Sequence, residues 1–193
     1  MKKSTKWIAG VLCAVLLVAA SVAGTMAYLT GSDEVQNTFT VGKLGIVLDE
    51  AKVDEYGVPV EDADRVKANT YKLVPGYTYV KDPTVWLQPQ SEACYLFVEV
   101  ENGLEGLGVD LEPQILANGW TQLENEAGVY YRLAPATGEE TAEYPVFADF
   151  TLSEELGKGE LADAEEAAIQ INAYAVQQKG FENAADAWST FDS

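Results

Sequence analysis

The sequence predicts an all-β protein, an antiparallel β-sandwich with short helices. In several segments apolar residues recur at every second position, which is the spacing of a strand with one buried face. Turn-forming residues separate these segments at short intervals, as in antiparallel sandwiches and barrels. We count about seven to nine strands on this basis. Because 48% of the 193 residues are hydrophobic, the chain can fill a core between two sheets.

The first predicted strand is the apolar run 44–48, and the acidic, aperiodic stretch 49–70 is interpreted as a loop or an edge excursion. A turn is predicted at 74–76, because Pro75 and Gly76 favour its two central positions. Strands are predicted over 77–87 and 94–101. The second should be half-buried, with every other residue inward: Cys94, Leu96, Val98 and Val100.

The second half of the chain continues the pattern. Segments 120–123 and 128–133 flank the polar stretch 124–127 and predict a hairpin. A strand is predicted over 144–152 and another near 168–177. The residues expected to point inward from these two strands are Val146, Ala148, Phe150, Leu152, Ile169, Ile171, Ala173 and Ala175.

Two short helices are predicted after residue 159. Segment 160–168 is rich in Ala and Glu and follows a break between two glycines. Near the C-terminus five residues fall at helical spacing: Phe181, Ala184, Ala185, Trp188 and Phe191. We expect this stripe to cap one end of the sandwich. The alternative is a helix that binds a partner.

Residues 1–27 form a predicted signal peptide, with three lysines before an apolar run and small residues at its end. Cleavage is expected between Ala27 and Tyr28. The alternative is a retained membrane anchor, because an apolar run of about 17 residues could marginally span a bilayer. Residues 28–42 are interpreted as an N-terminal arm, a possible donor strand, and residues 43–193 as the β-sandwich domain. Cleavage would leave Cys94 as the single cysteine.

The charge balance excludes several functions. The chain has 12 basic and 31 acidic residues and a formal net charge of −19, and it contains no histidine. Such a surface repels nucleic acid and anionic lipid, so membrane contact is expected only through the uncleaved leader. Without histidine, Ser-His-Asp triads and most zinc sites are excluded. No cofactor is expected, although weak divalent cation binding is possible.

No residue set predicts catalysis, so we expect no enzyme activity. The acidic residues of 54–64, 154–155 and 163–166 lack the spacing of a calcium-binding EF-hand loop and are interpreted as solvated faces. Cys94 lies inward in its strand pattern and is interpreted as a small core residue. The segment LAPATG at 133–138 is interpreted as a turn between strands.

Four segments together resemble a known family. They are GTMAYLTGSDEVQNTFTVGKLGIVL at 24–48, LVPGYTYVKDPTVWLQPQSEACYLFVEVEN at 73–102, WTQLENEAGVYYRL at 120–133 and AIQINAYAVQQKGFENAADAW at 168–188. On these the chain resembles the TasA and camelysin-like group, exported proteins of Gram-positive bacteria that a SipW-type signal peptidase processes. Camelysin-like members have carried a metalloprotease label, which a chain without histidine does not support.

The resemblance implies a jelly-roll-like sandwich that self-assembles into biofilm-matrix fibres by donor-strand complementation. The arm of one subunit would complete a sheet of the next, so the partners are other copies of the chain and the SipW-type signal peptidase during export. The residues expected to anchor the arm are Tyr28, Leu29, Val35 and Phe39. The alternatives are a monomeric secreted or cell-surface adhesion module and a secreted hydrolase. Which sheet edge accepts the arm does not follow from the sequence.

Overall fold

A computed structural model describes residues 30–32, 43–157, 160–161 and 168–191. In this part of the chain all paired strands run antiparallel, which confirms the all-β prediction. The largest sheet has five strands in the order β1-β10-β5-β7-β6. Their bounds are β1 Thr30–Ser32, β10 Ile169–Gln177, β5 Cys94–Asn102, β7 Val129–Ala134 and β6 Thr121–Gln122.

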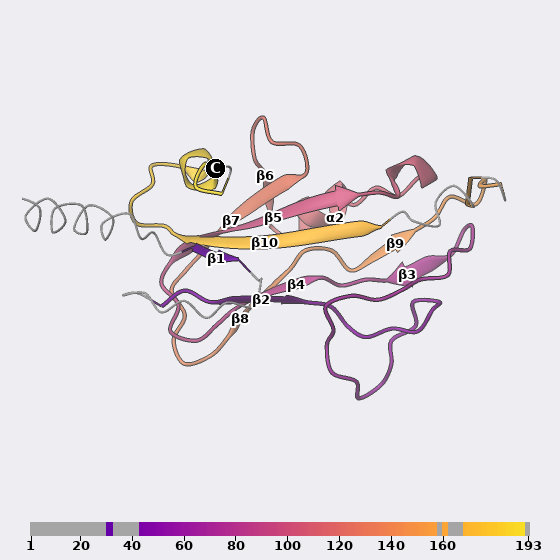
Figure 1. Cartoon of the computed structure of the whole chain (residues 1–193), viewed down its shortest axis with the longest axis horizontal. Helices are drawn as coiled ribbons and strands as arrows, with labels where there is room; N and C mark the ends of the chain where they lie inside the picture. The colour runs from indigo at the N-terminus through magenta and orange to yellow at the C-terminus, as the bar shows by residue number, and fades with distance from the viewer. Residues whose placement is uncertain (1–29, 33–42, 158–159, 162–167, 192–193) are drawn as a thin grey trace, which may run out of the picture.

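Two smaller sheets lie across from the five-stranded sheet (Figure 1). One has the order β2-β4-β8, with β2 Ile46–Asp49, β4 Thr84–Leu87 and β8 Ala142–Pro145. The other pairs β3 Thr78–Val80 with β9 Asp149–Thr151. The result is a layered, sandwich-like arrangement of antiparallel sheets.

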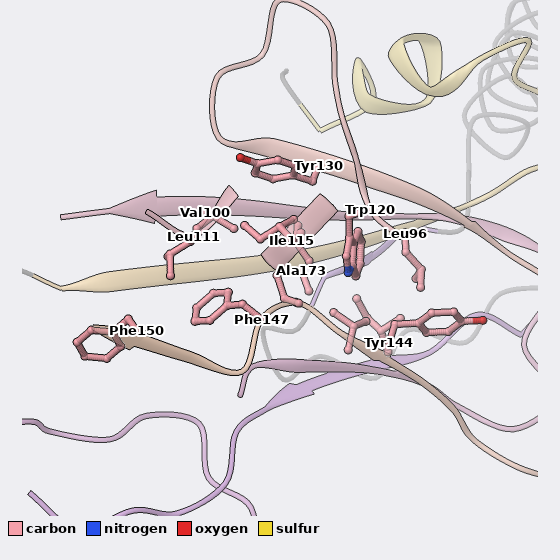
Figure 2. Close-up of a cluster of buried hydrophobic side chains, with 14 of the residues drawn as sticks. Leu96, Val100, Leu111, Ile115, Trp120, Tyr130, Tyr144, Phe147, Phe150 and Ala173 are labelled. Carbon is pink, nitrogen blue, oxygen red and sulfur yellow. The ribbon is translucent and has the colours of Figure 1, made fainter. Parts of the chain in front are cut away.

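The main core fills the space between these layers (Figure 2). The inward residues of β5 are Cys94, Leu96, Val98 and Val100, as their alternation predicts, and all four are buried. Ala173 and Ala175 of β10 are buried beside them, and Ile169 and Ile171 are partly buried. Ile115 closes the core from the short helix α2, Glu112–Ala117, which the sequence analysis did not predict.

A second cluster covers the outer face of the five-stranded sheet. Helix α4, Ala184–Trp188, packs there against Phe97, with the ring centroids of Phe97 and Trp188 5.2 Å apart. The prediction that β5 is half-buried is therefore wrong for Tyr95 and Phe97, which are 7% and 0% exposed. The helix covers a sheet face rather than an end of the sandwich.

Two predicted strands are each broken into two. Segment 77–87 divides into β3 and β4, and Pro83 at the break has no backbone N–H to donate to a sheet. Segment 144–152 divides between β8 and β9, and its alternation fails at the break. Val146 and Phe147 are both buried there, whereas Ala148 is exposed, contrary to the prediction. Each chain segment thereby crosses from one small sheet to the other.

Other predictions agree with the structure. The turn at 74–76 is present, with Gly76 at φ 71° and a hydrogen bond from Tyr77 N to Val74 O. Strands β6 and β7 form the predicted hairpin, and 135–141 connects β7 to β8. Of the predicted helix 160–168, Glu160 and Leu161 are helical and 162–167 lie outside the described residues. The predicted C-terminal stripe is wrong at one position, because Ala185 is exposed and Ala187 is buried instead.

Candidate functional site

The end strand β1 lies on β10 of the same chain (Figure 1). Its three residues pair antiparallel with residues 174–176, and Gly31 lies opposite Ala175. Because Thr30 is the third residue after the predicted cleavage site, β1 belongs to the predicted N-terminal arm. The structure thus places part of that arm at an edge of the five-stranded sheet.

Strand β10 is much longer than the strand that covers it. It has nine residues and pairs along its whole length with β5 on its other side. On the β1 side the described residues supply strand partners for residues 174–176, and none for residues 169–173. A sheet edge of this kind presents backbone donors and acceptors that a further strand can satisfy.

The other edges of the five-stranded and three-stranded sheets are less suited to strand addition. Strand β6 has two residues, both exposed. Strand β8 includes Pro145, which cannot donate a backbone hydrogen bond. Directly after β2 the chain enters the excursion 50–70, where Glu50 and Val66 exchange two backbone hydrogen bonds of 2.8 Å. These features leave β10 as the candidate acceptor edge.

The excursion is fastened to the three-stranded sheet by Arg65. Its Nη1 donates to Asp82 Oδ2 at 3.0 Å, its Nε pairs with Asp49, and its guanidinium lies 5.7 Å from the centroid of the Trp86 ring. Lys67 Nζ adds a hydrogen bond of 2.7 Å to Leu48 O. Basic residues of a strongly acidic chain are thus used to hold the stretch 49–70 against β2.

Three hydrogen-bonded side chains lie on the outer face of β10 and β5, beside the acceptor edge. Tyr174 Oη donates to Glu99 Oε2 at 3.1 Å, and Asn172 Nδ2 donates to the same oxygen at 3.3 Å. Burial raises the pKa of Tyr174 from 10.0 to about 12, and the hydrogen bond and negative charge of Glu99 add to the shift. The two side chains tie β10 to β5 on the face opposite the main core.

The other candidate residues of the N-terminal segment are not placed. Ala27 and Tyr28 at the cleavage site, and Leu29, Val35 and Phe39 of the arm, lie outside the described residues. The leader 1–27 does so as well. Among the residues that the structure describes, every helix is too short or too polar to cross a bilayer.

The acidic stretches form no metal centre in the part of the chain that is described. Asp54 Oδ1 instead accepts hydrogen bonds of 2.9 Å from the backbone N–H groups of Tyr56 and Val58, which shapes a turn. Residues 163–166 lie outside the described residues. Cys94 is fully buried in the main core, and burial raises the pKa of its thiol to about 12, so the core interpretation of this residue is confirmed.

No family model, curated protein or solved structure matches this chain. The resemblance to the TasA and camelysin-like group therefore remains a hypothesis. The fold and the contacts of the described residues carry the functional argument.

Two features of the structure do not follow from the sequence. The acceptor edge does not, because strand order depends on contacts between residues far apart in the chain. Neither does the contact of Glu50 with Asn69 and Lys81 beneath the excursion. The local signal is a lysine directly after a strand, followed by Asp82 and Pro83, and it does not indicate which residues the lysine contacts.

Proposed function

We propose that this protein is a secreted, non-enzymatic structural subunit that self-assembles into extracellular biofilm-matrix fibres. Its sandwich would be jelly-roll-like, and the N-terminal arm of one subunit would complete the five-stranded sheet of the next. The observation that carries the proposal is the pairing of β1 with three of the nine residues of β10. A short strand from the N-terminal arm and a longer acceptor edge are the two parts that donor-strand assembly needs.

The observed register supports a specific fit for a longer arm. Gly31 pairs with Ala175, so the same register continued on a neighbour's arm would bring Val35 opposite Ile171. Ile171 is partly buried against the main core and would offer an apolar contact to that side chain. Each added backbone hydrogen bond would contribute about 0.5–1.5 kcal/mol, against about 1–2 kcal/mol for ordering each arm residue.

Repetition of this contact would give a fibre. A head-to-tail contact between different surfaces does not close on itself unless the rotation allows a ring, so it propagates. Removal of the leader by a SipW-type signal peptidase would free the arm. Before that step the arm is continuous with the leader, so assembly would be confined to the exported, processed protein.

The alternative function is a monomeric secreted or cell-surface adhesion module. One observation favours it, because β1 pairs with β10 of its own chain. A subunit that keeps its arm in this place would satisfy its own edge and remain single. Both functions use the same strand pairing, and they differ in whether the strand comes from the same chain or from a neighbour.

Disulfide trapping between β1 and β10 separates the two functions. Gly31→Cys and Ala175→Cys are placed at directly opposed positions, whose spacing suits a disulfide. Each variant also carries Cys94→Ala, which removes the competing thiol. Two mature chains, each with one of the new cysteines, are mixed and oxidised, and the products are separated without reducing agent.

Donor-strand assembly predicts a mixed disulfide dimer from the two single variants. A double variant, which carries Gly31→Cys and Ala175→Cys in one chain, should give longer disulfide-linked chains. A double variant that forms only an internal disulfide, with no mixed dimer from the single variants at high concentration, would reject the fibre function. Electron microscopy of the processed protein and of a chain lacking residues 28–37 gives a second readout. Fibres should form from the first and not from the second.

A further inference from the structure

Three polar side chains meet beneath the excursion 50–70, which lies between β2 and β3. Lys81 Nζ donates to Glu50 Oε2 at 2.6 Å, and Asn69 Nδ2 donates to Glu50 Oε1 at 2.9 Å. Glu50 is 3% exposed and Lys81 is 8% exposed, although such residues are rarely buried. The buried amine of Lys81 and the partly buried carboxamide of Asn69 are therefore both held against one buried carboxylate.

The amide of Asn69 is fixed on both sides. Its Oδ1 accepts a hydrogen bond of 3.0 Å from Val53 N, and its Nδ2 also donates to Ala51 O at 2.8 Å. A backbone N–H on a carbonyl oxygen draws electron density from the carbonyl carbon. The same donor would stabilise negative charge on that oxygen if a nucleophile attacked the carbon.

The backbone holds the three residues in place. Glu50 is paired with Val66 by two backbone hydrogen bonds of 2.8 Å, and Lys81 N donates to Ala148 O at 3.1 Å. Tyr71 Oη donates to Val80 O, next to Lys81, at 3.1 Å. Tyr71 is partly buried against the main core, and burial, followed by the negative charge of Glu50, raises the pKa of its phenol.

We propose that Lys81 and Asn69 react spontaneously to form an intramolecular isopeptide bond, with Glu50 as the proton carrier. Lysine is a strong nucleophile when it is neutral and desolvated, and an adjacent base activates it. Holding the two reactants in one site removes most of the entropic cost of bringing them together. The step requires Lys81 Nζ to move from Oε2 of Glu50 toward Cγ of Asn69, whose Nδ2 is bound to the other oxygen of the same carboxylate.

The proposed step balances without any further reactant. Glu50 takes a proton from Lys81 Nζ, and the neutral amine attacks Cγ of Asn69, placing negative charge on Oδ1 beside Val53 N. Glu50 passes its proton to Nδ2 and takes a second one from Nζ. The bond from Cγ to Nδ2 breaks, Nδ2 leaves with both transferred protons as ammonium, and Glu50 ends as the carboxylate that it was.

The product would be a covalent link that the body otherwise lacks. Cys94 is the single cysteine of residues 28–193, so a chain processed after residue 27 cannot form an internal disulfide. A bond between Asn69 and Lys81 would join the end of the excursion to the end of β3. Links of this kind reduce the freedom of the unfolded chain and so favour the folded one.

Peptide mapping of the purified protein tests the proposal directly. Trypsin cuts after Lys67, Lys72 and Lys81, so an unlinked chain gives the peptides 68–72 and 73–81. The isopeptide bond predicts that cleavage after Lys81 is blocked and that 68–72 is attached to the peptide starting at Leu73. The joined species should weigh less than its two parts by one ammonia.

Free peptides 68–72 and 73–81 with unmodified side chains would overturn the proposal. So would an aspartate at position 69 without the link, since that shows attack by water. Asn69→Ala and Glu50→Gln should abolish the joined species, and Lys52→Arg, an exposed lysine of the same excursion, should retain it. A link that persists in Glu50→Gln would overturn the role of Glu50. If either variant fails to fold, the map of the unaltered chain still decides.

Discussion

The guanidinium carbon of Arg132 lies 4.7 Å from the centroid of the Tyr144 ring. Arg132 belongs to β7 of the five-stranded sheet and Tyr144 to β8 of the facing sheet, so the contact joins the two layers. The guanidinium also lies 5.6 Å from the Trp120 ring, and its Nη1 donates to Asn118 O at 3.0 Å. No ion pair within the described residues involves Arg132.

Substitution of Arg132 should separate the effect of its flat shape from that of its charge. Arg132→Met keeps an apolar stem and loses the cation–π contacts and the hydrogen bond, so we expect a loss of about 1 kcal/mol in the free energy of unfolding. Arg132→Lys keeps a charge that is more strongly hydrated and cannot stack, so its loss should be larger, about 2 kcal/mol. Urea unfolding of the three proteins measures the order. A lysine variant as stable as the original chain would contradict this explanation.

Tyr174 should make the protein less stable at high pH. Its pKa is raised from 10.0 to about 12 in the folded chain. Below pH 10 the folded and unfolded chains both keep the phenol proton, so the contribution of Tyr174 to the free energy of unfolding is fully present there. Between pH 10 and about 12 the unfolded chain loses this proton first, and the free energy of unfolding falls as the pH rises.

Tyr174→Phe tests this contribution. It removes the hydrogen bond to Glu99, so the variant should be less stable by about 1 kcal/mol near neutral pH. Its stability should then fall less steeply than that of the original chain between pH 10 and 12. Urea unfolding at several pH values in that range gives both slopes. Equal slopes would show that this phenol does not titrate differently in the two states.

The fold class could be predicted from the sequence because strand alternation is local. In β5 the inward residues Cys94 and Leu96 lie two positions apart, and no distant contact is needed to recognise them. The outward residue Phe97 shows the limit. Its alternation marks it as surface, yet it is fully buried because Trp188, ninety-one positions later, packs on it.

The candidate site depends on contacts that no local pattern contains. The pairing of Gly31 with Ala175 joins the two ends of the chain, and the contact of Glu50 with Lys81 spans the whole excursion. The breaks near Pro83 and Val146 have a related cause. Alternation predicts one continuous strand in each case, but the chain there crosses between two small sheets, and only sheet order shows that.

Fibre formation should increase with salt, divalent cations or acid. The predicted leader contains Lys2, Lys3 and Lys6, so its removal would take the formal net charge from −19 to −22. Copies of such a chain repel each other, and dissolved salt screens this repulsion over about 8–10 Å near physiological ionic strength. Light scattering or sedimentation of the processed protein over a series of salt concentrations and pH values measures the effect. Assembly that is indifferent to both would show that repulsion between subunits does not limit it.

Adding a methyl group at Gly57 should weaken the packing of the excursion 50–70 against the rest of the fold. Its φ of 73° is one that L side chains rarely adopt, and a Cβ added there would lie 2.9 Å from both Cα and Cβ of Tyr79. Tyr79 is fully buried, with its ring stacked on Phe150 at a centroid distance of 5.0 Å, so it has little room to move. Gly57→Ala should therefore destabilise the fold by about 1–3 kcal/mol.

Gly106→Ala is the matched control for this change. An added Cβ at Gly106 meets nothing within 4 Å, and its φ lies outside the left-handed region. Alanine gives the unfolded chain less conformational freedom than glycine does. The free energy of unfolding of this variant should therefore be unchanged or higher by up to about 1 kcal/mol. Limited proteolysis should cut the excursion 50–70 faster in Gly57→Ala than in the control, because the lost contact with Tyr79 frees that segment first. Equal cutting rates, together with an undiminished free energy of unfolding, would mean that the backbone at Gly57 adapts and that Tyr79 does not hold the excursion in place.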